Sequence, residues 1–140
     1  MRVNPGTLLG VNLQPGQVGE ARITVDASNV ASAYGSGCID VFATPAMIAL
    51  MENAARACVD PHLADGSVSV GTRVDVRHLA ATPIGLVVEA RAELIQVDGR
   101  RLVFRVTATD PTEVVGEGTH ERMIVDSTRL LARANAKSAG

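Results

Sequence analysis

One apolar segment, residues 44–60, constrains the fold more than any other feature: its sequence is TPAMIALMENAARACVD. Thr44 suits a helix N-cap, Pro45 suits the first helical position, and the DPHLADGS sequence that follows predicts that the helix ends after Val59. Because nearly every position is apolar, we expect the helix to be covered on most of its circumference. Glu52 stands in its middle, where a buried carboxylate is costly unless it is paired or functional.

The second half of the chain predicts β-strands, with no further helix until the C-terminus. In SVSVGTRVDVRHLA the even-numbered residues from Val68 to His78 share one face of a strand, so we expect a buried stripe that His78 extends. Asp98-Gly99-Arg100 predicts a hairpin turn, and Gly116 and Gly118 indicate a bulge. The expected strands are residues 20–26, 67–80, 85–97, 101–109 and 113–125.

These elements predict one α+β domain over residues 1–140, in which an antiparallel sheet wraps around a central helix. Residues 1–19, with their NPG and QPG turns, are expected to form a loosely ordered lead-in, and residues 126–140 a short exposed C-terminal helix and tail. A sheet this small leaves strand edges and much of the helix uncovered. Pairing two copies edge to edge covers both, so a homodimer is expected, with a dimer of dimers as a further option.

Charge and cysteine usage exclude several classes of partner. The chain has 13 Lys and Arg against 15 Asp and Glu, without a basic run, so we expect no binding to nucleic acid. The longest strongly apolar stretch, about residues 41–51, is far shorter than the roughly 20 residues that cross a bilayer, so no membrane partner is expected. Cys38 and Cys58 have no metal-ligand spacing, which predicts no metal site and a reduced, cytoplasmic location.

Four segments carry a resemblance to a known family: VFATPAMIALMENAA, SVGTRVDVRHLAATPIGL, GRRLVFRVTATD and GEGTHERMIV. Together they resemble the hotdog-fold thioesterases of the fluoroacetyl-CoA thioesterase type, over roughly residues 38–125, and Thr44, Glu52 and His78 match the order and spacing of that family's motif. The resemblance implies a homodimer with active sites at the subunit interface. It also implies hydrolysis of a short acyl-CoA, halogenated or not, to the free acid and CoA, with no cofactor because coenzyme A is part of the substrate.

Thioester hydrolysis requires a nucleophile or an activated water, a donor for the developing oxyanion and an acid for the leaving thiolate. We assign Glu52 to activate water or to attack the carbonyl carbon directly, His78 to proton transfer and Thr44 to a positioning hydrogen bond. Gly71 lacks a Cβ and would let the thioester approach the backbone closely, with its N–H as a donor. Arg122 is a candidate neighbour of this site.

On the substrate side, the resemblance implies an aromatic lid over the acyl pocket at the position that Cys38 occupies here. We therefore expect this lid to be absent and the pocket mouth to be open. Phe42 and Tyr34 are the nearby aromatic residues that would replace it.

Each site residue also has a purely structural interpretation. Thr44 would only cap the helix, His78 would be a core histidine, Glu52 would pair with Arg56 one turn later, and Gly71 would mark a bulge.

The spacing of Thr44 and Glu52 leaves a second question open. Eight helical positions correspond to roughly 12 Å of axial rise. Either the helix begins later than Thr44, or the groups meet across a dimer. Two other functions also remain open on this fold: a hydratase acting on an enoyl or hydroxyacyl thioester, and an acyl-CoA binding module without hydrolysis.

Overall fold

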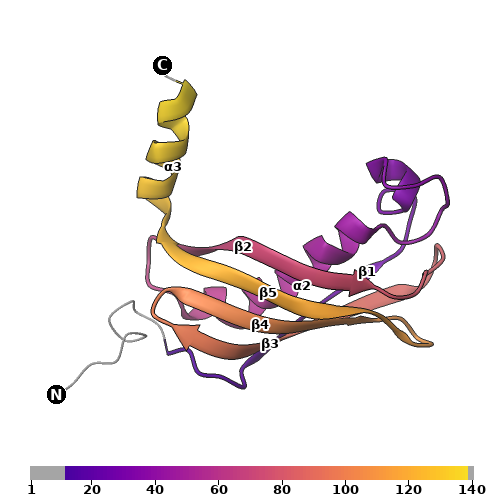
Figure 1. The fold of residues 1–140 in the computed structure, drawn as a ribbon, viewed down its shortest axis with the longest axis horizontal. Helices are drawn as coiled ribbons and strands as arrows, with labels where there is room; N and C mark the ends of the chain where they lie inside the picture. The colour runs from indigo at the N-terminus through magenta and orange to yellow at the C-terminus, as the bar shows by residue number, and fades with distance from the viewer. Residues whose placement is uncertain (1–11, 139–140) are drawn as a thin grey trace.

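The computed structural model describes residues 12–138 and contains a five-stranded antiparallel sheet curled around one helix, α2 (Figure 1). The strands lie in the order β1-β3-β4-β5-β2. Their bounds are β1 Val18–Thr24, β2 Ser67–His78, β3 Val87–Asp98, β4 Arg101–Thr109 and β5 Val114–Asp126, and the helices are α2 Thr44–Val59 and α3 Ser127–Asn135. Three short 3-10 turns are η1 Ala31–Tyr34, η2 Asp60–His62 and η3 Ala136–Ser138. The predicted α+β architecture is confirmed.

Helix α2 packs on the inner face of the sheet through one side only. Its buried residues recur at intervals of three and four, as expected of an amphipathic helix. They are Ala46, Met47, Leu50, Met51, Ala54, Ala55, Cys58 and Val59. Pro45, Ala49, Asn53 and Arg56 form an exposed stripe on the other side. The expectation that most of the circumference is covered is therefore wrong for one chain, because a single sheet covers one face.

Strand β1 begins two residues earlier than predicted, at Val18, within the expected lead-in. Residues 1–11 of that lead-in lie outside the described residues. At Gly19, β1 approaches the helix so closely that a Cβ would overlap the backbone of Ala54 and Cys58. A residue without a side chain is therefore what lets β1 pack directly on α2.

Strand β2 contains a bulge that changes which residues face the helix. It lies at the sheet edge and pairs with β5, and its register shifts between Gly71 and Arg73, leaving Thr72 as the extra residue. Before the bulge the odd-numbered residue Gly71 faces inward, opposite Arg122; after it the even-numbered residue His78 faces inward. The predicted single buried stripe from Val68 to His78 is wrong: Val68 and Val74 are 36% and 40% exposed, and Val68 lies on the outer face.

The predicted hairpin and the predicted bulge of β5 are both present. Asp98 pairs with Arg101 around Gly99, whose φ of 60° is the left-handed conformation that the hairpin requires. The β4–β5 register shifts beside Gly116, which confirms a bulge there. Helix α3 has no buried residue and extends away from the end of the sheet (Figure 1). Among residues 12–138, no helix is both long enough and apolar enough to cross a membrane.

Candidate active site

The start of α2 and the end of β2 bring Thr44 and His78 into contact. Thr44 Oγ1 lies 2.7 Å from His78 Nδ1. Thr44 is the first helical residue, and the N-cap is Ala43, which is extended and provides no side-chain cap. The prediction that Thr44 caps the helix is therefore wrong, because its hydroxyl is paired with the imidazole instead of a helix N–H.

The His78 imidazole is held in its neutral form. It is half-buried, and burial lowers its pKa. A backbone hydrogen bond at Ala80 raises the pKa by a smaller amount. Its Nε2 is buried and has no hydrogen-bonding partner among residues 12–138. A neutral imidazole with a free ring nitrogen is suited to proton transfer.

A cavity of about 290 Å³ adjoins Thr44 and His78. Its other lining residues are small or apolar: Ala31, Ser36, Val41, Phe42, Leu79, Ala80 and Ala81. Phe42 thus lines the cavity, with only 1% of its surface exposed. Cys38 is exposed on the preceding loop, outside this lining, and Tyr34 is 49% exposed.

Glu52 lies in a second cluster, together with Gly71 and Arg122. Its Oε2 is 3.4 Å from Arg122 Nη1, and a Cβ added at Gly71 would come within 2.6 Å of the same oxygen. The Glu52 side chain is 39% exposed in this chain, so the expected burial of this carboxylate is wrong for one chain, whereas the Arg122 side chain is only 5% exposed. The alternative pairing of Glu52 with Arg56 is wrong too, because Arg56 pairs with Asp60.

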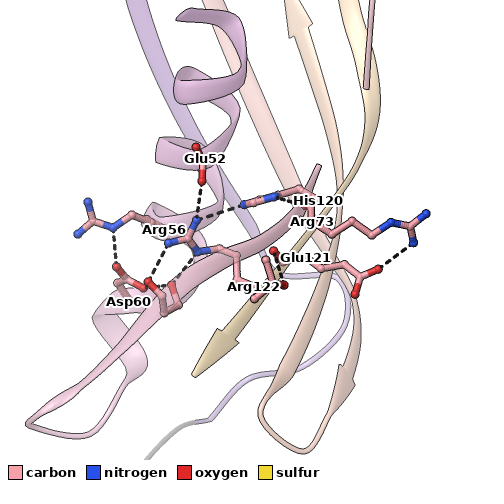
Figure 2. A network of polar contacts seen from close by, with 9 residues as sticks. Glu52, Arg56, Asp60, Arg73, His120, Glu121 and Arg122 are labelled. Carbon is pink, nitrogen blue, oxygen red and sulfur yellow. Dashed lines mark hydrogen bonds and ion pairs between the residues drawn. The ribbon is translucent and has the colours of Figure 1, made fainter. Parts of the chain in front are cut away.

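A chain of polar contacts links Arg122 to the far end of α2 (Figure 2). Arg122 Nε donates to Ser69 Oγ and Nη2 donates to the Ser69 carbonyl, each at 2.8 Å. Ser69 Oγ in turn donates to Asp60 at 2.7 Å. Burial lowers the pKa of Arg122, and the carboxylates of Asp60 and Glu52 oppose that effect. The buried cation is therefore compensated from two sides.

His120 completes the cluster, although its local sequence predicts only a strand residue. It is 1% exposed, its Nδ1 lies 2.8 Å from the Arg73 carbonyl oxygen, and its Nε2 lies 3.2 Å from Arg122 Nη1 (Figure 2). Nδ1 must donate to that carbonyl, so Nε2 is the acceptor for Arg122. The signal was present: His120, Arg122 and Ile124 alternate along one strand, which places all three on the inner face.

The two clusters are separated within one chain. Six residues of β2 lie between Gly71 and His78, so roughly 20 Å of strand separates the two positions. Helix α2 begins at Thr44, so the alternative of a late helix start, which would have let Thr44 and Glu52 meet within one chain, is wrong. Among residues 12–138 no group of three or more His, Cys, Asp or Glu is arranged to hold a metal ion.

Comparison with known proteins agrees with this geometry. A solved structure of the fluoroacetyl-CoA thioesterase superposes with a TM-score of 0.85 at 36% identity, covering 90% of this chain and 98% of that one. A thioesterase superfamily member from Thermus thermophilus gives a TM-score of 0.84 at 25% identity, covering 91% and 95%. The fold is that of a hotdog-fold thioesterase.

Sequence comparison identifies the family. The profile described as fluoroacetyl-CoA-specific thioesterase matches residues 25–128, and the fluoroacetyl-CoA thioesterase of Streptantibioticus cattleyicolor is 44% identical over 99 residues, 71% of each chain. The chain belongs to the fluoroacetyl-CoA-specific thioesterase family.

The neutral state of His120 predicts how stability depends on pH. Burial, the largest effect, and the charge of Arg122 lower the pKa of His120 below the usual 6.5, whereas the hydrogen bond that His120 donates to the Arg73 carbonyl raises it. Below about pH 6.5 the unfolded chain therefore takes up a proton that the folded chain does not, and stability falls as the pH falls. We expect chemical denaturation between pH 7.5 and 5 to show a smaller acid loss for His120→Gln than for wild type.

His62 provides the matched control, because it is exposed. His62→Gln should follow the wild-type pH dependence. If His120→Gln lost stability toward acid as steeply as wild type, His120 would not be held neutral by the fold.

Proposed function

We propose that this protein is an acyl-CoA thioesterase that hydrolyses a short acyl-CoA to the free acid and CoA. The observation that carries the proposal is the half-exposed carboxylate of Glu52, which contacts the buried Arg122. It also lies beside Gly71, the one position of β2 that has no side chain. Related structures with 34–36% identity were solved with acetyl-CoA, and with fluoroacetate and CoA. Coenzyme A is proposed as part of the substrate, and no separate cofactor is invoked.

In this reaction Glu52 removes a proton from water or attacks the thioester carbonyl carbon itself. Gly71 leaves room for the thioester beside the carboxylate, and Arg122 supplies positive charge where the oxyanion develops. His78, with its unpartnered Nε2, transfers a proton, and Thr44 orients the imidazole through Nδ1. The thiolate leaving group has a low proton affinity, so little acid assistance is required.

We further propose that the working unit is a homodimer formed through β2. This strand is 12 residues long, lies at the sheet edge, and exposes Val74 and, just after its end, Leu79. Antiparallel pairing with the same strand of a second copy would continue the sheet and help to cover the exposed stripe of α2. If this pairing is centred on the middle of β2, it brings the partner's His78 toward Gly71 and Glu52 of the first chain.

The bulge at Thr72 supports this arrangement, because it turns Gly71 and His78 to the same face of the sheet. Each active site would then combine Glu52 of one chain with the Thr44–His78 pair of the other. The dimer-of-dimers option stays a proposal.

Both cysteines among the described residues are free, which supports a reduced, cytoplasmic location.

The first prediction concerns the role of Glu52. Glu52→Gln keeps the size and a hydrogen-bonding group but removes the base or nucleophile, so kcat should fall about 100-fold or more. This fall in kcat is measured as the release of free thiol from a panel of short acyl-CoAs, followed with a thiol reagent.

Glu117→Gln, an exposed carboxylate on the outer side of β5, is the control and should stay fully active. Full activity of a folded Glu52→Gln would remove Glu52 from the chemistry. In the wild type, a change of enoyl absorbance without thiol release would indicate a hydratase, and binding without either signal would indicate an acyl-CoA binding module.

The second prediction tests the shared site. Glu52→Gln and His78→Ala should each be nearly inactive alone. If each site uses groups from two chains, half of the randomly mixed dimers carry one intact site, so equal mixing after unfolding and refolding should restore about a quarter of wild-type activity. Mixing without any recovery, under conditions where wild type refolds fully, would show that each chain carries its own complete site.

The third prediction concerns substrate choice. Cys38 is small and exposed at the position of the expected aromatic lid, and the cavity beside Thr44 and His78 is lined mainly by small apolar residues. One small substituent in an apolar pocket is worth only about 1–3 kcal/mol. We therefore expect hydrolysis of short to medium acyl-CoAs, with kcat/KM for fluoroacetyl-CoA exceeding that for acetyl-CoA by no more than roughly 200-fold.

A preference of many thousandfold for fluoroacetyl-CoA would contradict this prediction. It would mean that another residue closes the pocket, and Phe42→Ala and Tyr34→Ala would then identify which aromatic side chain does so.

A further inference from the structure

The Arg122 guanidinium is held by its surroundings on three sides. Four of its five N–H donors have an acceptor. Two of these contacts, both at 2.8 Å, are made to Ser69, through its hydroxyl and its carbonyl oxygen. The remaining two both start from Nη1, which faces His120 Nε2 at 3.2 Å and Glu52 Oε2 at 3.4 Å. The orientation of Nη1 toward Glu52 therefore depends on the second residue that contacts Nη1, which is His120.

We propose that His120 is a positioning residue that, together with Ser69, aims the Arg122 guanidinium at Glu52. The inference rests on the proposed thioesterase function and assigns a role within that same site. His120 does not reach Glu52 in any contact of the described residues, and it acts through Arg122 alone.

The tautomer of His120 is what makes this possible. The Arg73 carbonyl accepts from Nδ1, which fixes the proton there and leaves the Nε2 lone pair directed at Arg122 (Figure 2). A protonated imidazole would present a donor to a donor and place a second positive charge beside the guanidinium. The surroundings oppose that state, since His120 is 1% exposed and stacks on Phe104 with ring centroids 6.0 Å apart.

The contacts of His120 also indicate that it positions Arg122 and does not compensate its charge. Asp60 and Glu52 already supply negative charge near Arg122, and His120, being neutral, adds none. Its contribution is an acceptor at a fixed place. An apolar residue there would leave one Nη1 hydrogen buried without a partner, and the guanidinium would turn to satisfy it at the expense of the contact with Glu52.

The kinetic test compares His120→Leu with His120→Gln, whose Oε1 places an acceptor close to the position of Nε2. His120→Leu should lower kcat about tenfold or more with KM changed less than about threefold, because the reacting carboxylate loses its orientation. His120→Gln should recover most of kcat. Val88→Ala, a fully buried core position on β3 with no polar contact to Arg122, should lower the melting temperature and spare kcat.

A second measurement needs no substrate. In ¹⁵N spectra of the whole protein, the two Nη1 hydrogens of Arg122 should give separate signals in wild type and in His120→Gln, and should merge in His120→Leu as the group rotates. If wild type hydrolyses none of the acyl-CoAs, the proposed function fails and these signals alone decide the positioning role. Unchanged Nη1 signals in His120→Leu would overturn the proposal, as would a loss of kcat in His120→Gln equal to that in His120→Leu.

Discussion

Burial of one face of α2 against the inner surface of the sheet is the constraint on which the rest of the structure depends. The buried positions include several alanines, and Gly19 removes the last side chain between β1 and the helix backbone, so helix and sheet lie close together. With the helix fixed in this way, Thr44 at its first turn reaches the end of β2, and Glu52 two turns later reaches the middle of the same strand. The active-site geometry is thus a consequence of how the core packs.

The bulge at Thr72 is the second determinant, because it decides which side chains of β2 share a face with α2. In a regular strand, Gly71 and His78 differ in parity and would point to opposite sides of the sheet. The extra residue reverses the alternation, so that Gly71 meets Glu52 and His78 meets Thr44 on the inner side. Natural sheets commonly use bulges near active sites to redirect a side chain. Here one inserted residue places both the middle and the end of the strand in contact with the same helix.

Much of the fold follows from local sequence patterns, whereas the site depends on pairings that no local pattern specifies. The α2 bounds, the Asp98–Gly99 hairpin and the alternation of β3, β4 and β5 are set by helix-start and helix-stop residues such as Pro45, by turn chemistry and by parity, so the sequence predicts them correctly. The β2 stripe fails because its alternation runs unbroken through a bulge that only the register with β5 reveals. Thr44 fails as a cap because its hydroxyl contacts His78, which is distant in the sequence. Arg56 fails as the partner of Glu52 because Asp60 is better placed to pair with it. His120 and Arg122 could have been placed on the inner face by parity, but their contacts with Arg73 and Ser69 come from strand pairing.

The lengths of the contacts around Arg122 indicate what the buried charge is for. A guanidinium that served stability alone would be expected to form short, paired bonds to its carboxylate, since burying a charge is costly unless the geometry compensates it. Instead its shortest bonds, at 2.8 Å, go to the uncharged oxygens of Ser69, and its contact with Glu52 is the longest, at 3.4 Å. Arg122 is held rigidly by neutral acceptors while Glu52 keeps 39% of its side chain exposed. This arrangement gives the carboxylate a cation beside it without tying up its oxygens, which is what the role proposed for Glu52 requires.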